Sequence, residues 1–554
     1  MRTLVNNLRP RGRKDLRWML WVLFTMPGLF AQNPTASALV NAASMVPTAL
    51  PNSNIAPGSL FVIFGTNLGP ATLVQAGLPL PAASGLAGTS VQITSGNFTA
   101  QAPILYTSSN QVAAILPSRT PAGSGTVTVT YKGLTGAGLP IQVTPASFGI
   151  FTLPQNGLGA AAATFSDYSL VSPTHSAKPG DIITLWGTGL GPIAGDDAGM
   201  PPVGDLSTPV QVYVGSQTAT VAYHGRAGCC AGLDQINLVV PTGTEGCSVP
   251  VSVDTAGTTS NFPSISIAAN GGVCSAPYSP QFIPELTALQ SKGSINAGFL
   301  DVDRITDIQD GDSAVMLDVG EGAFFPYTAD LLIQRQVPVS VPSCSVGWFK
   351  LTDFTAASPP LNQGGLNGGP TIQVTGPAGD RTMQMVPNVP EISDGPYSGF
   401  YSGQLGSGDY LSPGAYTLSN GTGGSDVGGF SATVTVPPPF TWTNEASFFA
   451  IDRSQPLTVT WTGGDPNGTV TVLGYSYVNS TLASSFSCVA PASAGQFTVP
   501  ARILQATAPS VVGPNSNVLA VTSYSQMLPF TAPGLDFGII EFITVFNNVN
   551  PIFY

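Results

Sequence analysis

Residues 57–70 read PGSLFVIFGTNLGP and residues 179–192 read PGDIITLWGTGLGP, so seven of 14 positions are identical. In both copies a Pro-Gly turn precedes a run of β-favouring residues, LFVIF or IITLW, and Gly-Thr-x-Leu-Gly follows it. A short apolar run between turn residues predicts a buried strand. Its unbroken apolarity indicates that the strand is buried on both faces or lies at a domain junction.

The similarity continues on both sides of this stretch. NQVAAILP at 110–117 matches DQINLVVP at 234–241, and VQI at 91–93 corresponds to VQV at 210–212. The matches keep the same order and a spacing of about 120 residues, which fits one β-sandwich module better than one coil of a solenoid. We therefore expect module one over residues 35–145 and module two over residues 146–276.

The turn after the repeated strand is rich in glycine in both copies. It is defined by Gly65, Asn67 and Gly69 in the first copy and by Gly187, Gly189 and Gly191 in the second. Asn67 and Gly189 are equivalent, and Asn and Gly are the residues that best accept positive φ. We expect a left-handed kink at both positions, so that Val at 189 is strained and Asn is accepted. No helix pattern or Lys follows, so the glycines are no phosphate cradle.

Composition limits the fold class of the whole chain. The chain has 554 residues with 64 Gly and 50 Pro, and only 8% are charged, against roughly 25% in ordinary soluble domains. Because 43% are hydrophobic, the chain can bury a core and disorder is disfavoured. Frequent Gly and Pro disfavour helical bundles. An all-β, multi-domain protein of short strands and tight turns is the fold that remains.

The N-terminus has the pattern of an export signal. Six basic residues precede a 13-residue apolar run over Trp18–Phe30, which is too short to span a bilayer and typical of a signal peptide. We expect residues 1–31 to be a signal peptide that is cleaved after Ala31, with an uncleaved N-terminal anchor as the alternative. No Arg-Arg pair is present, which favours general secretion. No later apolar run predicts a membrane span after cleavage.

Cleavage would leave a strongly acidic protein. Six of the 17 basic and one of the 29 acidic residues lie in residues 1–31, so the mature chain carries 11 basic and 28 acidic groups, a net charge of −17. Such a surface repels phosphate backbones, and we expect no nucleic-acid partner.

The repeated residues resemble a known family. Together with NAAS at 41–44 and HGRAGCCAGLDQINLVVP at 224–241, they are similar to the uncharacterised immunoglobulin-like repeat found near the C-termini of secreted acidobacterial (Solibacter-type) proteins. That repeat is itself similar to IPT/TIG immunoglobulin-like folds. The resemblance covers residues 38–275 and implies tandem immunoglobulin-like β-sandwich domains and export. It implies no catalytic residue and no ligand.

The C-terminal half has the same β character without a visible third copy. PTIQVTGPAG at 370–379 and PLTVTWTGGDPNGTVTVLGYSY at 456–477 alternate apolar and polar residues around turn signals. The Pro run at 437–439 cannot continue a central strand. We therefore expect a third β-sandwich over residues 290–436 and a fourth over residues 440–554.

Six cysteines in an exported chain indicate disulfides. They are Cys229, Cys230, Cys247, Cys274, Cys344 and Cys488. The first four lie within 46 residues and allow three connectivities. We favour separate bridges from Cys229 and Cys230 to Cys247 and Cys274, because a ring between adjacent residues is strained. A redox-switching or metal-binding Cys pair is the alternative, although zinc favours CxxC-type spacing and histidines, and the chain has two histidines.

Two further clusters are candidate binding sites. The segment DVDRITDIQDGD carries the calcium candidates Asp301, Asp303, Asp307, Asp310 and Asp312. It departs from the EF-hand pattern because Ile305 stands at the third ligand position, and a solvated turn is the alternative. Asp196 and Asp197 are read as a polar loop tip. The aromatic cluster Tyr397, Phe400, Tyr401, Tyr410 and Tyr416 could stack on sugars or fill a sandwich core.

Motifs for catalysis are missing from the sequence. We find no G-x-S-x-G elbow, HExxH helix, Walker loop or dinucleotide fingerprint, and two histidines offer few general bases. The sequence favours a secreted or surface-displayed protein with a structural, adhesion or recognition role, no catalysis and no cofactor. Its partner would be an extracellular protein or glycan. The alternatives are a carbohydrate-binding accessory protein and an unrecognised glycan hydrolase that uses a carboxylate pair.

Overall fold

The computed structural model describes residues 32–275, 292–308, 315–327, 340–350, 365–386, 399–479, 481–510, 517–549 and 551–554. In this part the fold is all-β, as the sequence predicts, with several sheets and one short α-helix, α4 (Ala501–Ala506). The expected signal peptide, residues 1–31, lies outside the described residues. None of the described helices has the length and apolarity that a bilayer crossing requires.

Module one is a sandwich of two antiparallel sheets. Its strands are β1 (Thr35–Asn41), β2 (Leu60–Thr66), β3 (Val74–Gln75), β4 (Thr89–Ser95), β5 (Phe98–Gln101), β6 (Ile104–Thr107), β7 (Gln111–Ile115), β8 (Gly123–Tyr131), β9 (Leu134–Thr135) and β10 (Leu139–Val143). One sheet has the order β1-β2-β7-β6-β3 and the other β10-β8-β4-β5. Alternate residues of both sheets, among them Phe61, Ile93 and Val127, meet in one buried core.

Module two repeats this arrangement with one difference. Its strands are β11 (Gly149–Ile150), β12 (Ala163–Thr164), β13 (Ile182–Thr188), β14 (Val210–Val214), β15 (Gln217–Arg226), β16 (Asp234–Val239), β17 (Gly246–Thr255), β18 (Thr258–Thr259) and β19 (Ser264–Ile267). The long β15 pairs first with β14 and then with β16, whereas β5 and β6 of module one are separate strands. Pro103 lies between those two, and proline has no N–H for a ladder bond.

The repeated strands correspond, but their burial differs. All of Leu60–Ile63 in β2 is buried, as a strand covered on both faces should be. In β13 burial alternates over residues 182–186, with Ile183 and Leu185 in the core and Ile182 54% exposed. Of the two expected arrangements, burial on both faces holds for β2. Strand β13 instead lies at a domain junction, because its last residue, Thr188, bonds to the Leu60 N–H of module one.

The C-terminal half is built on one 13-stranded sheet. Its elements are β20 (Ile295–Ile308), β21 (Val315–Tyr327), β22 (Ser343–Lys350), β23 (Thr371–Gly376), β24 (Gly379–Met385), β25 (Phe400–Gly406), β26 (Gly414–Ser419), β27 (Ser431–Val436), β28 (Thr441–Trp442), η2 (Glu445–Ser447), β29 (Ala450–Ile451), β30 (Leu457–Thr462), β31 (Thr469–Asn479), β32 (Leu482–Pro491), η3 (Ala492–Ala494), β33 (Gln496–Val499), α4, β34 (Val518–Tyr524), β35 (Leu528–Pro529), β36 (Phe537–Val549) and β37 (Ile552–Phe553). Strands β28, β30 and β33 form a smaller sheet.

The expected division into a sandwich over 290–436 and another over 440–554 is not what the structure has. Strand β36 runs parallel to β20, and β22 pairs with β32. Each core consequently contains residues from both segments: Phe542 packs in the core around Leu300, and Val346 packs in the core around Val472. The Pro run does end β27, at Val436. The end of one strand does not make a domain boundary here, because strands before the Pro run pair with strands after it.

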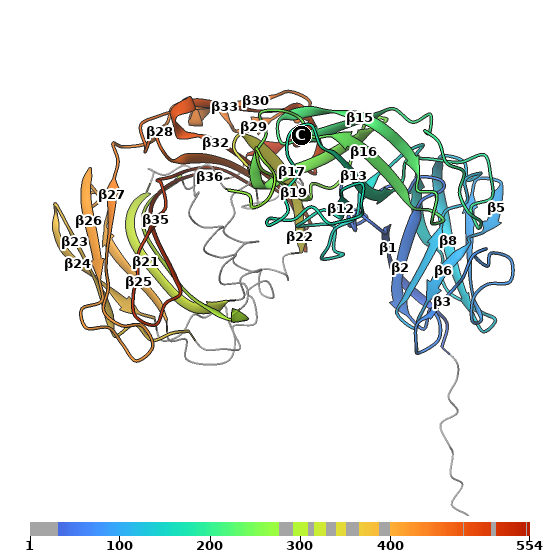
Figure 1. The fold of residues 1–554 in the computed structure, drawn as a ribbon, viewed down its shortest axis with the longest axis horizontal. Helices are drawn as coiled ribbons and strands as arrows, with labels where there is room; N and C mark the ends of the chain where they lie inside the picture. Colours follow the sequence, from blue (N-terminus) through green and yellow to red (C-terminus); the bar gives the residue numbers. More distant parts are fainter. Residues whose placement is uncertain are drawn as a thin grey trace, which may run out of the picture.

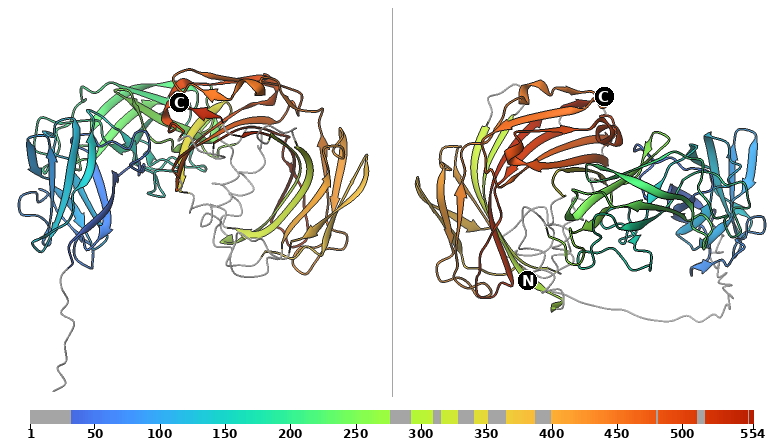
Figure 2. Two further views of the ribbon diagram at one scale, coloured as in Figure 1. Left: turned by 180° about the vertical axis from the view of Figure 1, so that it is seen from behind. Right: turned by 45° about the horizontal axis from the view of Figure 1, so that its top comes forward.

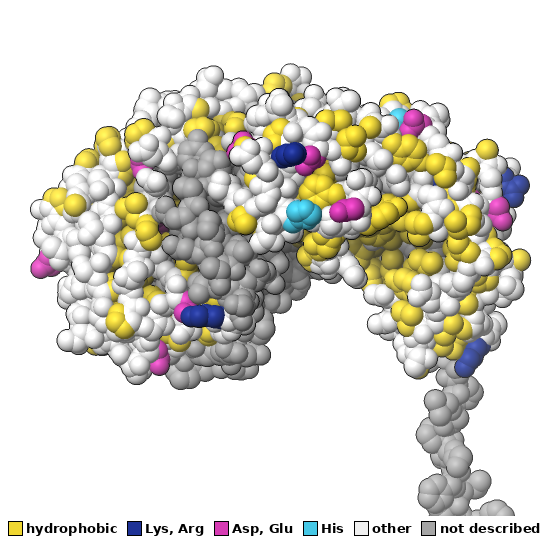
Figure 3. Space-filling model, viewed as in Figure 1, with side chains coloured by type: hydrophobic (Ala, Val, Ile, Leu, Met, Phe, Trp, Pro, Cys, Tyr) yellow, Lys and Arg dark blue, Asp and Glu magenta, His cyan; other side chains and the backbone are white. Residues whose placement is uncertain are grey.

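The described parts form an arch. Module one lies on one flank, module two lies in the middle, and the long strands of the 13-stranded sheet lie on the other flank (Figures 1 and 2). Few charged side chains interrupt the face shown in Figure 3, where most of the surface is hydrophobic or uncharged. This agrees with the 8% of charged residues in the sequence.

The two repeated turns both have a left-handed residue. Asn67 has a φ of 56° and Gly189 a φ of 117°, and the following Leu68 and Leu190 are fully buried. The two positions are nevertheless not interchangeable. A Cβ atom at Gly189 would lie 2.0 Å from the carbonyl oxygen of Ser147, so the expected acceptance of Asn at 189 is wrong.

The other glycines of the turn permit close approaches. A Cβ atom at Gly65 would lie 2.1 Å from the Thr35 carbonyl oxygen, and one at Gly187 would lie 2.2 Å from the ring of Phe148. A Cβ atom at Gly69 would lie 2.1 Å from the Thr107 hydroxyl oxygen. Neighbouring strands and loops thus pack directly against this backbone.

We predict that Gly189→Asn and Gly189→Val both destabilise the protein. A left-handed backbone costs a side-chain-bearing residue about 1–3 kcal/mol, and the contact with Ser147 adds to this cost. Gly180→Ala is the matched control, because Gly180 has a φ of 91° with open space around its Cβ position. Denaturant melts should show a larger loss for either Gly189 variant than for the control. Wild-type stability of Gly189→Asn would contradict the close approach.

Candidate functional site

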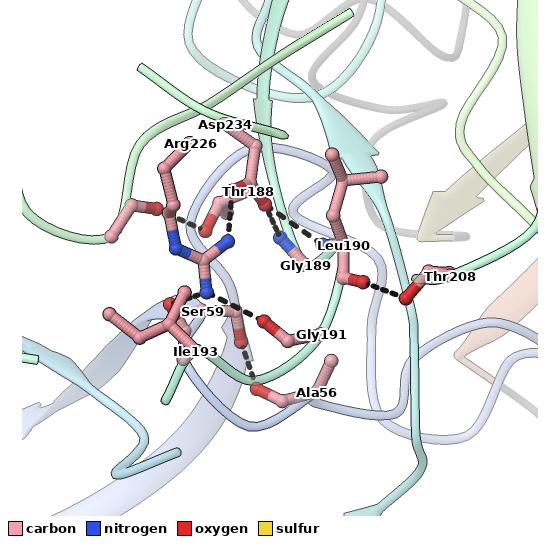
Figure 4. A network of polar contacts seen from close by, with 12 residues as sticks. Ala56, Ser59, Thr188, Gly189, Leu190, Gly191, Ile193, Thr208, Arg226 and Asp234 are labelled. Atoms are coloured by element: carbon pink, nitrogen blue, oxygen red, sulfur yellow. Dashed lines mark hydrogen bonds and ion pairs between the residues drawn. The ribbon is translucent and has the colours of Figure 1, made fainter. Parts of the chain in front are cut away.

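The repeated turn of module two forms the contact with module one (Figure 4). Arg226 ends β15 and Asp234 begins β16, and the two residues are paired across the ladder. Their side chains are 1% and 0% exposed, and the guanidinium Nη1 forms an ion pair with the carboxylate Oδ1. The guanidinium Nη2 donates to the Gly191 carbonyl at 2.6 Å and to the Gly58 carbonyl of module one at 3.2 Å.

The carboxylate of Asp234 also fixes the turn itself. Its Oδ2 accepts hydrogen bonds from the backbone N–H groups of Gly189 at 2.7 Å and Leu190 at 2.8 Å. A charge that is excluded from water is costly unless it is paired and hydrogen-bonded. The Asp234 carboxylate is thus satisfied within module two. The Arg226 guanidinium also binds the Gly58 carbonyl, and this bond links the buried ion pair to the orientation of module one.

Neutral side chains complete this junction. The Thr188 hydroxyl accepts from the Leu60 N–H of module one at 2.8 Å and donates to the Gly232 carbonyl at 2.7 Å. The Asn41 amide of module one donates to the Thr188 carbonyl at 3.1 Å. All of these groups are buried, so water cannot replace the partners that separation would remove.

Asp197 belongs to the junction as well. Its carboxylate accepts from the Ser118 N–H at 2.7 Å and from the Ser118 hydroxyl at 2.6 Å. Burial raises the pKa of Asp197, although the bonds from Ser118 oppose this shift. The interpretation of Asp197 as a polar loop tip is therefore wrong, because the side chain binds module one.

Module two also contacts the C-terminal half. The Arg502 guanidinium of α4 lies 3.8 Å from the ring centroid of Tyr213, and its Nη1 donates to the Ser252 hydroxyl at 3.3 Å. Phe262 packs into the core of the C-terminal half. Leu50 of module one packs with Leu482. Module two thus contacts module one and the C-terminal half, and module one also contacts the C-terminal half directly.

All six cysteines are paired, but not as we expected. The bridges are Cys229–Cys230, Cys247–Cys274 and Cys344–Cys488. The Cα atoms of Cys247 and Cys274 lie 5.3 Å apart, so these two residues bridge one another, and the exposed neighbours Cys229 and Cys230 bridge each other. Cys344 and Cys488 are opposite residues of β22 and β32, which are the two strands that join the expected third and fourth modules.

The calcium candidates are only partly brought together. Asp301 and Asp303 lie on β20 and Glu321 lies opposite on β21, with one carboxylate oxygen of each within 4.8 Å of the others. Asp307 is at the far end of β20, and residues 310 and 312 lie outside the described residues. A solvated turn is the wrong description for Asp301 and Asp303, since both are partly buried strand residues.

A fourth carboxylate, Glu541 of β36, lies beside Asp301 in the ladder. Burial, with the neighbouring Glu321, raises the pKa of Asp301 to about 7. Burial, with Asp301, raises the pKa of Glu541 to about 8, and burial likewise raises the pKa of Asp303. The three oxygen donors of Asp301, Asp303 and Glu321 suit a hard cation such as calcium, or the carboxylates share protons at neutral pH. The sequence reasoning missed Glu321 and Glu541 because only strand pairing brings them near Asp301.

The aromatic cluster is a core and no sugar platform. Tyr401, Tyr410 and Tyr416 are at most 1% exposed, and their hydroxyls each donate to a backbone carbonyl at 2.7 Å. Phe400 is half-buried, and residue 397 lies outside the described residues. The alternating pattern therefore marks sandwich packing.

Comparison with known proteins finds only distant structural similarities. No family model matches the chain, and no curated protein matches it. Among solved structures, the Escherichia coli adhesin FdeC is 13% identical over 70% of this chain and 94% of its own, with a TM-score of 0.15. SGBP-B from a Bacteroides uniformis xyloglucan utilization locus is 9% identical over 85% and 100%, with a TM-score of 0.18. The titin Ig tandem A164–A165 is 8% identical over 43% and 97%, with a TM-score of 0.12.

We predict that the carboxylate cluster makes the protein less stable as pH rises. The folded state holds protons that the unfolded chain releases above about pH 4. The contribution of these carboxylates to the free energy of unfolding is therefore fully present near about pH 4. It is lost as the pH rises through about 7–8, where the folded carboxylates ionise. Asp301→Asn should flatten this dependence and raise the free energy of unfolding at pH 8. Denaturant melts from pH 5 to 9 measure it, with the exposed Asp380→Asn as control.

The same melts test the calcium hypothesis. Calcium chloride at pH 8 should stabilise the wild-type protein and leave Asp301→Asn unchanged if the cluster binds the ion. A pH dependence that Asp301→Asn leaves intact would contradict the assignment of the raised pKa values to this cluster.

Proposed function

We propose that this chain is an exported, non-catalytic protein that holds its β-sandwich modules in one fixed arch and serves in adhesion or recognition outside the cell. The observation that carries the proposal is the buried junction of Arg226, Asp234 and Gly58. A protein that presents binding faces to a large partner needs their relative positions fixed. Domains that move independently would have no need of buried charges where they meet.

The chemistry of the junction supports a rigid connection. Interfaces between domains of one chain are commonly polar and mobile. Here, separation would expose Leu60, whose N–H is bonded to Thr188, and would leave the Arg226 guanidinium without the Gly58 carbonyl. The second contact, between Arg502 and Tyr213, supports the same orientation from the other end of module two.

The cysteines support an extracellular location. Disulfides persist in oxidising compartments and are rare in the cytosol, and all six cysteines of this chain are bridged. The basic and apolar N-terminal segment supports secretion by a signal peptide. We also infer that modules one and two are copies of the IPT/TIG-like repeat that their motifs resemble.

The carboxylates support a non-catalytic role. Hydrolysis of a glycosidic bond requires two carboxyl groups that flank an open substrate site. In the cluster on β20 and β36, Asp301 Oδ1, Asp303 Oδ1 and Glu541 Oε2 are buried, and none has a hydrogen-bond partner among the described residues. This enclosure favours a structural or ion-binding role over acid–base chemistry.

Small-angle scattering of the mature chain, residues 32–554, tests the proposal. The wild-type curve should fit a single arch. Arg226→Met leaves the Asp234 carboxylate buried and unpaired, which costs about 3–5 kcal/mol, and should increase the radius of gyration. Thr188→Val removes only the hydroxyl between the modules and should loosen the arch in a protein that still folds. The exposed Arg119→Met, next to Ser118, is the matched control.

Two results would contradict the proposal. The first is a scattering result: either the wild-type curve requires many module orientations, or the wild type, Arg226→Met and Thr188→Val give equal curves. The other is a chain recovered in the cytoplasm that still begins at Met1 and carries free thiols. N-terminal sequencing and thiol titration of the exported protein should instead find Gln32 first and no free thiol.

A further inference from the structure

Module two carries an open cleft on the outer face of β13 and β16, which are neighbouring strands in Figure 1. The cleft has a volume of about 220 Å³. The residues that define it, here called the module-two cleft, are Tyr168, Ile182, Thr184, Trp186, Gln235 and Asn237. It lies outside the junction and outside the carboxylate cluster.

Strand alternation explains why these side chains meet. In β13, Ile183 and Leu185 point into the core, so Ile182, Thr184 and Trp186 point outward. In β16, Gln235 and Asn237 alternate in the same way with two core residues. The ladder pairs Trp186 with Gln235 and Thr184 with Asn237, which places an aromatic ring beside amide and hydroxyl groups.

A turn between β12 and β13 adds a second ring. Tyr168 is 74% exposed and has a φ of 66°, a conformation that is unfavourable for an aromatic residue. The turn is held by the Ser169 hydroxyl, which donates to the Asp167 carboxylate at 2.6 Å. The Tyr168 and Trp186 rings are 18° from parallel with centroids 6.3 Å apart. The protein therefore keeps two aligned aromatic faces at the edge of the cleft.

The polar groups of the cleft are oriented but only partly used. The Trp186 indole N–H donates to the Thr164 hydroxyl at 3.0 Å, which fixes the ring. The Asn237 Oδ1 accepts from the Thr184 hydroxyl at 3.0 Å and from the Gln235 amide at 3.3 Å. Among the described residues, no bond engages the Asn237 Nδ2 or the Gln235 Oε1. One donor and one acceptor thus remain for a ligand.

These features define the chemistry of the ligand. No charged side chain lines the module-two cleft, so a charged group would gain no ion pair there. A sugar ring has apolar C–H faces that pack on aromatic rings and hydroxyl edges that bond to amides. A peptide strand would need a free sheet edge, but β13 is paired on both sides, by β12 and β16.

We propose that the module-two cleft binds a neutral hexose ring of an extracellular glycan. The volume is below the roughly 300–1,000 Å³ of pockets for drug-sized ligands, which suits one ring of a longer chain that runs over the open surface. This proposal rests on the proposed function, because it assigns the recognition role to a defined site on the arch.

Titration calorimetry of the mature chain tests the proposal. The probes are the neutral hexasaccharides cellohexaose, mannohexaose and β-1,4-galactohexaose, and the charged hexamer of galacturonic acid. At least one neutral probe should bind, and the charged hexamer should bind more weakly. Tyr168→Ala and Trp186→Ala should each weaken binding at least tenfold. Phe449→Ala is the matched control, because Phe449 is 72% exposed elsewhere in the chain, and it should bind as the wild type does.

The outcomes separate this proposal from the rigid arch. Failure of all neutral probes to bind, wild-type affinity of Tyr168→Ala, or preference for the charged hexamer would overturn the glycan site. Scattering of Tyr168→Ala should equal that of the wild type, because Tyr168 takes part in none of the hydrogen bonds of the junction. Tight glycan binding by a protein whose modules scatter as a flexible chain would overturn the arch and support the cleft.

Discussion

A guanidinium and a carboxylate that are both excluded from water determine how this protein is assembled. Arg226 and Asp234 can remain charged in the interior only if their hydrogen-bonding groups are satisfied. Their partners are the Gly58 and Gly191 carbonyls and the N–H groups of the turn at Gly189 and Leu190. The bonds to Asp234 therefore shape the turn of module two, and the bond from Arg226 to the Gly58 carbonyl positions module one against it.

The rest of the arch is built by strands that pair across the two sandwiches expected in the C-terminal half. Strand β36 pairs with β20 and β34, and β22 pairs with β32, so the C-terminal half is one unit with two large cores and a smaller one. Its contact with module two, through Arg502 and Tyr213, continues the scaffold. The proposed glycan site uses side chains on an outer sheet face, where Tyr168 and Trp186 do not contribute to the core.

Local patterns predicted what depends on local physics. The repeat, the all-β class, the left-handed residues at Asn67 and Gly189 and the strand end before the Pro run are all read from neighbouring residues. What depends on pairing between distant segments was not predicted: the shared C-terminal sheet and the approach of Glu321 and Glu541 to Asp301. One signal for the junction was present in the sequence, because Asp234 of module two replaces Asn110 of module one. A charge in only one copy of a repeat indicates a role that the other copy lacks.

Amide hydrogen exchange tests most directly whether the junction is a fixed part of the native structure. The Leu60 N–H is the best reporter, because its partner, the Thr188 hydroxyl, belongs to the other module. Protection against exchange reports the free energy of opening. A rigid junction predicts that Leu60 exchanges as slowly as Ile183 in the core of module two. Exchange of Leu60 at the rate of exposed loop amides, while Ile183 stays protected, would show that the modules separate and would contradict the account.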